Sequence, residues 1–115
     1  MPTLRLDALA IAEMASGHKC LNLTEQMSWE GFPDYADTLL SEISGSVVKR
    51  WDSFDVRLWE VRIGGLTVLR LGGVDIKLVF DDFPVMVSLE SDSSAGDRLI
   101  ERLYATLSGI PKHTS

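Results

Sequence analysis

The hydrophobic residues between Phe32 and Ile43 follow the period of an α-helix. They recur at steps of 4, 3, 1 and 3 residues, which places them on one stripe of a helical surface. Pro33 suits the first turn, Asp34 lies at the positive end of the helix dipole, and Gly45 suits the end of the helix. The segment is therefore predicted to be a core-facing helix, with a stripe formed by Phe32, Ala36, Leu39, Leu40 and Ile43.

Beyond this helix the hydrophobic spacing changes to the two-residue period of β-strands. Gly64-Gly65 suits a tight hairpin turn, so the segments on either side of it are expected to pair. A shorter strand is predicted before the helix, at residues 20–24. The main prediction is an antiparallel meander of about five strands, at residues 47–51, 54–63, 66–71, 74–80 and 85–89.

The predicted strand 54–63 breaks its alternation at Leu58-Trp59. Apolar residues occupy even positions up to Leu58 and odd positions from Trp59 onward. A β-bulge, or burial of both faces, would produce this break. If the odd positions instead face outward, they form an apolar strip suited to binding another protein. The candidate interaction surface consists of Trp51, Trp59, Val61 and Ile63.

Two more segments are predicted to be helical. One begins near Ser94, which with Asp97 resembles a capping box, and ends at Gly109. Its apolar stripe consists of Leu99, Ile100, Leu103, Tyr104 and Leu107. The Ala-rich segment 4–16, ended by Gly17, is predicted to be a short helix. The alternation around Leu4 leaves a strand as the alternative.

These elements predict an α+β fold. We expect a two-layer sandwich, in which the antiparallel meander carries both amphipathic helices on one face. The order is β-α-β-β-β-β-α with an extra N-terminal segment. Val56 and Leu58 are assigned to the core and Arg57 to the opposite face of the sheet. Residues 1–115 form one domain, with the core at about 20–110, an N-terminal extension at 1–17 and a flexible tail at 111–115.

Composition narrows the classes of function. The chain has 115 residues, 45% of them hydrophobic, and a net charge of −6, which indicates one folded domain. An acidic chain with scattered basic residues is a poor binder of duplex nucleic acid. No segment is apolar enough to span a membrane. The apolar run at 9–15 is interrupted by Glu13, so no secretion signal is predicted and a cytoplasmic location is expected.

The residues that could carry chemistry are few. The single cysteine, Cys20, excludes an internal disulfide and paired-cysteine zinc sites. On a strand, Cys20 and His18 would share a face about 6–7 Å apart, as a nucleophile and base would. The favoured alternative makes Cys20 a small apolar residue at the start of a strand. The second histidine, His113, lies in the predicted tail.

Asp81 and Asp82 form the other candidate pair. Two carboxylates in one turn could share a proton or bind Mg²⁺, but a solvated hairpin turn is the favoured interpretation. The glycine pairs do not form a phosphate-binding loop, and no Gly-x-Ser-x-Gly sequence is present. We therefore predict no catalytic residue, no cofactor and no metal, and we do not expect an enzyme.

Several short sequences are distributed along residues 29–109: Trp-Glu-Gly-Phe from Trp29, Arg50-Trp51, Leu58-Trp59-Glu60, Phe80-Asp81-Asp82-Phe83 and Val87-Ser88-Leu89-Glu90. With these the segment resembles a family of small uncharacterised bacterial proteins. The resemblance implies a β-α-β(4)-α layout and no known activity. By analogy, small proteins of this kind include immunity partners of toxins and products of mobile gene cassettes.

The sequence favours a non-enzymatic interaction module that binds another protein or a second copy of itself. The acidic composition, the surplus of tryptophan and the absence of a catalytic motif support this expectation. The alternative is a small-molecule-binding domain with a cleft between the sheet and the helices, near Trp51 or Trp59.

Overall fold

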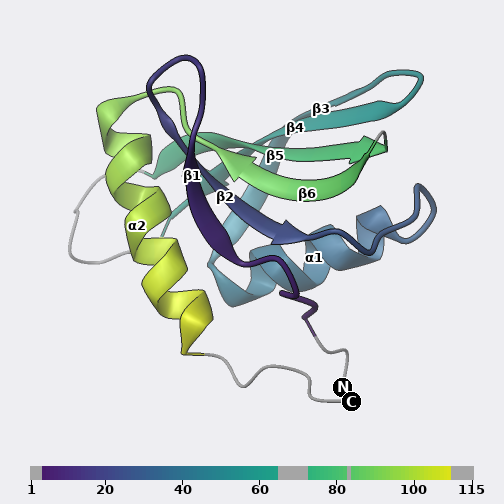
Figure 1. The fold of residues 1–115 in the computed structure, drawn as a ribbon, viewed down its shortest axis with the longest axis horizontal. Helices are drawn as coiled ribbons and strands as arrows, with labels where there is room; N and C mark the ends of the chain where they lie inside the picture. The colour runs from purple at the N-terminus through teal and green to yellow at the C-terminus, as the bar shows by residue number, and fades with distance from the viewer. Residues whose placement is uncertain (1–3, 65–72, 83, 110–115) are drawn as a thin grey trace.

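The computed structural model describes residues 4–64, 73–82 and 84–109 of the chain. Strands β1 (Ala10–Glu13) and β2 (Lys19–Thr24) precede helix α1 (Phe32–Glu42), and helix α2 (Ser94–Ser108) comes last, as Figure 1 shows. Between the helices lie strands β3 (Gly45–Asp52), β4 (Val56–Ile63), β5 (Val74–Asp82) and β6 (Val85–Glu90). The protein is α+β, as predicted.

All the described strands belong to one antiparallel sheet, in the order β1-β2-β6-β5-β4-β3. β3 to β6 form a meander, and β2 pairs with β6 and so adds the N-terminal hairpin to the same sheet. The strand predicted at 66–71 lies outside the described residues. β4 is paired on both sides, with β3 and with β5.

Helix α1 confirms the prediction from the apolar stripe. Its buried residues face the core, and Pro33 occupies the first turn. Its end differs, because Ser44 (φ 57°) and not Gly45 adopts the left-handed conformation. Gly45 begins β3, where a Cβ atom would lie 2.7 Å from Cδ1 of Ile63 and 2.8 Å from Cδ2 of Leu40. The glycine therefore serves close packing and not the helix end.

Helix α2 lies where the sequence predicts it, but its start is built differently. Ser93 is the N-cap, and its Oγ accepts a hydrogen bond of 2.9 Å from the backbone N–H of Gly96. The predicted capping box of Ser94 and Asp97 was wrong, because the Asp97 carboxylate bonds to residues before and at the start of β2 instead. Gly109 ends the helix, as predicted, in a right-handed conformation with φ −79°.

The helix predicted at residues 4–16 was wrong. This segment contains β1, which pairs with β2 from Ala10 opposite Asn22 onward. Leu4 and Leu6 lie ahead of the strand and are buried in the core. Tyr35 of α1 fixes them in place, since its hydroxyl donates a 2.6 Å hydrogen bond to the carbonyl of Arg5. Long-range pairing and burial thus decide the conformation of this Ala-rich stretch.

The register of the sheet defines its two faces. The inner face carries the cross-strand neighbours Trp59, Leu78, Leu89 and Leu21. α1 packs there, because the Phe32 ring lies 4.8 Å from the Trp59 ring. α2 reaches the same face at Lys19, which lies two residues from Leu21 and pairs with Glu101. The outer face carries the residues between these, among them Leu58, Val79, Ser88 and Asn22.

Candidate functional site

Three of the four residues predicted as an exposed surface are buried. Trp59, Val61 and Ile63 are 1%, 0% and 1% exposed and belong to the core on the inner face. The bulge that was one explanation of the broken alternation is absent from the pairing of β4 with β5, which has no register shift. Because side chains alternate, the even positions of β4 face outward, so the assignment of Val56 and Leu58 to the core was also wrong.

Trp51 is the predicted surface residue that is exposed. It pairs with Leu58 on the outer face and keeps 53% of its surface accessible. β3 shifts register between Val47 and Lys49, and this irregularity sets the phase that turns Trp51 outward. Phe54, predicted to begin a strand, lies before β4 and is 97% exposed.

On the outer face, Trp51 ends a continuous row of cross-strand neighbours that carry no formal charge. The row crosses the described sheet from one edge strand to the other, and Val79 and Ser88 lie buried at its centre. We call it the uncharged row; it consists of Ala10, Asn22, Ser88, Val79, Leu58 and Trp51. An antiparallel sheet needs one apolar face to fold, so the apolar residues Val79, Leu58 and Trp51 on the other face require another explanation.

A charged row runs beside the uncharged row. Its members alternate in sign across the strands β6, β5, β4 and β3, in the order Glu90, Lys77, Glu60 and Lys49. Partial burial raises the pKa of Glu90, and the nearby Lys77 lowers it in part. Beyond this row, Arg62 and Asp75 form a cross-strand ion pair, with Nε 2.7 Å from Oδ1.

The inner face holds a cluster of aromatic rings with arginine side chains against them. The Arg50 guanidinium lies over the Trp59 ring, with its Cζ 4.5 Å from the ring centroid. The Nε1–H of Trp59 donates a 2.8 Å hydrogen bond to Asp52. The Phe32 ring stacks on Phe80 at 5.4 Å. These contacts hold the Trp59 indole in a fixed orientation, as its burial requires.

Arg57 was predicted on the outer face and lies on the inner one. It pairs with Phe80 across the strands, and its guanidinium lies 4.1 Å from the centroid of the Trp29 ring and 5.9 Å from that of Phe32. Its Nε is buried without a hydrogen-bond partner among the described residues. No carboxylate of the described residues forms an ion pair with Arg57 or Arg50. A buried donor without a partner lowers stability, so Arg57 invites a functional explanation.

His18 and Cys20, the candidate base and nucleophile, do not contact each other. Nδ1 of His18 lies 3.0 Å from Oδ2 of Asp97, whereas the Sγ of Cys20 lies 3.9 Å from Oδ1 of Asn22. Burial raises the pKa of the Cys20 thiol and Glu90 raises it further, so the thiol stays protonated at neutral pH. The structure thus favours the apolar interpretation of Cys20.

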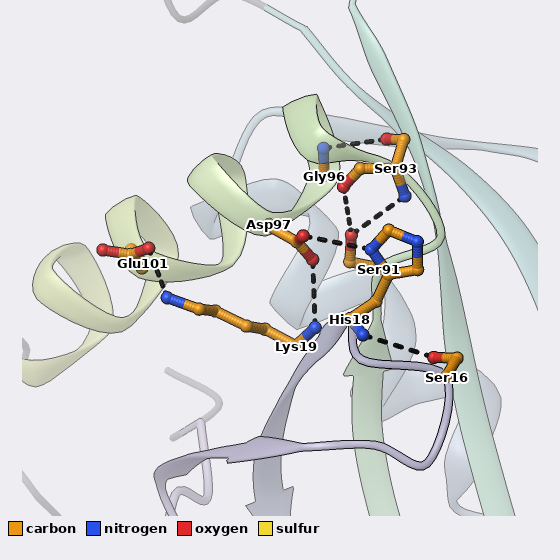
Figure 2. A network of polar contacts seen from close by, with 8 residues as sticks. All are labelled: Ser16, His18, Lys19, Ser91, Ser93, Gly96, Asp97 and Glu101. Carbon is orange, nitrogen blue, oxygen red and sulfur yellow. Dashed lines mark hydrogen bonds and ion pairs between the residues drawn. The ribbon is translucent and has the colours of Figure 1, made fainter.

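Asp97 is the centre of the polar network drawn in Figure 2. Its Oδ1 accepts a 2.9 Å hydrogen bond from the backbone N–H of Lys19, and its Oδ2 contacts His18. The Lys19 bond and then the His18 bond lower the pKa of Asp97 to about 2. The Lys19 ammonium continues to Glu101, one turn further along α2. The network ties the turn between β1 and β2 to the first turns of α2.

Asp81 and Asp82 do not converge on a shared site. They are the last residues of β5, paired with Met86 and Val85, and neighbours on a strand point to opposite faces. Asp81 and Asp82 thus belong to a strand and not to a turn, and Phe83 lies outside the described residues. Within residues 4–64, 73–82 and 84–109, no group of three or more His, Cys, Asp or Glu side chains could hold a metal ion.

The model of a family described as "Protein of unknown function (DUF3630)" matches residues 9–109, which include every helix and strand described above. No curated protein and no solved structure matches the chain. Among the described residues, neither helix is long and apolar enough to cross a membrane.

Proposed function

We propose that this chain, which belongs to the DUF3630 family, is a protein-interaction domain that binds its partner through the outer face of the sheet. In this proposal the domain is a two-layer sandwich: α1 and α2 cover the inner face, and the outer face receives the partner. The domain acts by binding and not by catalysing a reaction.

The exposure of Trp51 at the end of the uncharged row carries this proposal. Tryptophan is enriched among the residues that dominate binding energy, and charged residues are depleted from the centres of interfaces. The uncharged row combines both properties along a line that crosses the sheet. Leu58 lies next to Trp51 and is half-buried, so the two side chains form an apolar patch at one end of the row.

A photo-cross-linking amino acid at position 51 tests the proposal, with position 104 as the matched control. Tyr104 is also an exposed aromatic residue, but it lies on α2. In cells that express the chain, we expect Trp51→benzoylphenylalanine to give one adduct of defined mass, and Tyr104→benzoylphenylalanine to give none. An absence of adducts at position 51, or identical adducts at both positions, would contradict the proposal.

Binding of a small anion beside α1 is the second candidate function, and the buried Nε of Arg57 favours it. An anionic oxygen could accept from this donor while the guanidinium keeps its contact with Trp29. Titration with inorganic phosphate and with succinate, followed by tryptophan fluorescence, tests this function. We expect a saturable change that Arg57→Met abolishes and Trp51→Ser retains; an identical response in Arg57→Met would refute it.

A further inference from the structure

The charges of the outer face are arranged about the line between β4 and β5. On one side, β4 and β3 carry Glu60, Arg62 and Lys49; on the other, β5 and β6 carry Lys77, Asp75 and Glu90. Reflection across the line exchanges each of these positions with one of opposite charge. Asp81, further along β5, mirrors the uncharged Val56.

A two-fold axis along this line would place a second copy of the sheet on the first with opposite charges in contact. Lys77 would face Glu60 of the second copy, Glu90 would face Lys49, and Asp75 would face Arg62. Each contact occurs twice, because a two-fold interface uses the same surface of both copies. Two sheets that pack face to face keep their strands nearly aligned, so these central positions stay in register.

The uncharged row fits the same axis. Val79 would face Leu58 of the second copy, which joins two apolar side chains near the axis. Ser88 would face Trp51, so the large exposed side chain meets a small, buried one. Trp51 would thereby lose its contact with water at a position where the opposing sheet leaves room.

Other axes do not give this match. An axis along β5 would set Lys77 against Lys77 and Asp75 against Asp75 of the second copy. An axis along β4 would set Glu60 against Glu60 and Arg62 against Arg62 of the second copy. An axis across the strands, centred on the uncharged row, would bring together one pair of opposite charges, Lys77 and Asp81, and would set Glu60 against Val56 and Glu90 against Met86 of the second copy. The axis between β4 and β5 leaves Asp81 opposite Val56, but it brings together three pairs of opposite charges.

We propose that the partner of the outer face is a second copy of this chain, placed by the two-fold axis between β4 and β5. This inference rests on the proposed function and names the partner of that surface. Within one chain, neither Lys49 nor Lys77 forms an ion pair with another described residue. The charges of Lys49 and Lys77 are thus available for the second copy.

Complementary charge reversals test the axis. Glu60→Lys and Lys77→Glu each set like charges against each other twice in a homodimer, and we expect each to weaken dimerisation at least about tenfold in sedimentation equilibrium. Mixed with each other, the two variants restore opposite charges at both contacts, so a heterodimer should form. The double variant Glu60→Lys/Lys77→Glu should dimerise like the parent chain.

The mixture separates contacts between chains from contacts within one chain. Glu60 and Lys77 are also cross-strand neighbours, and mixing leaves their intrachain repulsion in place. Arg98→Glu on the exposed side of α2 is the control and should leave dimerisation unchanged. Circular dichroism verifies that every variant is folded.

Three outcomes would overturn the inference. They are a parent chain that is monomeric at every concentration, a dimer that stays intact in both reversals, and a mixture that does not restore the dimer. If the parent is monomeric and the cross-linker at position 51 captures a different protein, the proposed function survives and only the second copy is refuted. If neither experiment finds a partner, both are refuted.

Discussion

Replacement of Arg57 by methionine tests whether its buried donor is a cost to the fold. The guanidinium lies over the Trp29 ring at 4.1 Å, and a contact of this kind contributes about 0.5–2 kcal/mol. The Nε is buried and unpaired, and an unmade hydrogen bond of this kind costs about 1–3 kcal/mol. The range for the unmade hydrogen bond lies higher than the range for the contact with Trp29. Removing the guanidinium should therefore gain at least as much stability as it loses.

Methionine keeps an unbranched stem against the same rings, and its sulfur adds about 0.3–1.5 kcal/mol on an aromatic neighbour. We therefore expect Arg57→Met to unfold with a free energy equal to that of the parent or up to about 2 kcal/mol higher. Arg57→Ala also loses the stem, at about 0.8 kcal/mol for each buried methylene, and should be less stable than Arg57→Met by about 1.5–2.5 kcal/mol.

Urea denaturation followed by circular dichroism measures these differences, since the midpoint shifts while the slope stays constant. Arg98→Met, at an exposed position of α2, is the control and should change stability by less than about 0.5 kcal/mol. A loss of more than about 2 kcal/mol in Arg57→Met, with an unchanged slope, would refute the reasoning. It would mean that the Nε has a partner in solution that stabilises the fold.

Two more predictions concern the packing at β3 and the polar network of α2. Gly45→Ala should lower the free energy of unfolding by about 1–3 kcal/mol, because the added Cβ would meet two buried side chains. Gly64→Ala is the control and should change this free energy little, because nothing lies within 4 Å of its Cβ. Urea denaturation measures both variants. The folded state lowers the pKa of Asp97 from 3.8 to about 2, so its stabilising effect is complete above about pH 4 and is lost as the pH falls toward 2. Asp97→Asn should therefore remove part of the fall in stability between pH 5 and pH 2 in acid titrations monitored by circular dichroism, and an unchanged acid limb would contradict the assignment.

The two helices and the strands β2, β3, β5 and β6 could be predicted from the sequence because their signals are local. The stripe of α1 lies within 12 residues, from Phe32 to Ile43. Pro33 indicates where the helix begins, and Gly45 lies just beyond its end. Helix ends were less certain, because Ser93 and Ser94 are equally good caps by residue type. Only the contact of Asp97 with β2 removes it from the capping box.

The faces of β4 could not be predicted, because apolar residues occupy both parities. A change of one residue in phase moves the whole set from one face to the other, and the sequence offers Val56 and Leu58 for one choice and Trp59 and Val61 for the other. The choice is made by α1, whose Phe32 packs on Trp59, and this contact spans 27 residues of sequence (59 minus 32). The position of Arg57 follows from the same phase.

The same ambiguity explains how the candidate surface was both found and misplaced. Trp51 was predicted because three tryptophans are numerous for a chain of 115 residues, and its exposure follows from the register shift of β3. Leu58 and Val79 were missed, because they were assigned to the core or left unassigned. The sequence did indicate such residues, because these strands carry more apolar residues than one buried face needs.

That excess is an argument about function and not only about prediction. The core combines buried residues of α1 and α2 with Trp59 and alternate residues of β4. Folding places no comparable demand on the outward side of the same strand, where polar residues are tolerated. Apolar side chains at Val56, Leu58 and Trp51 on two adjacent strands therefore carry a solubility cost that the isolated fold does not need. A partner that covers them removes this cost, and the alternating charges beside them restrict which surfaces can do so.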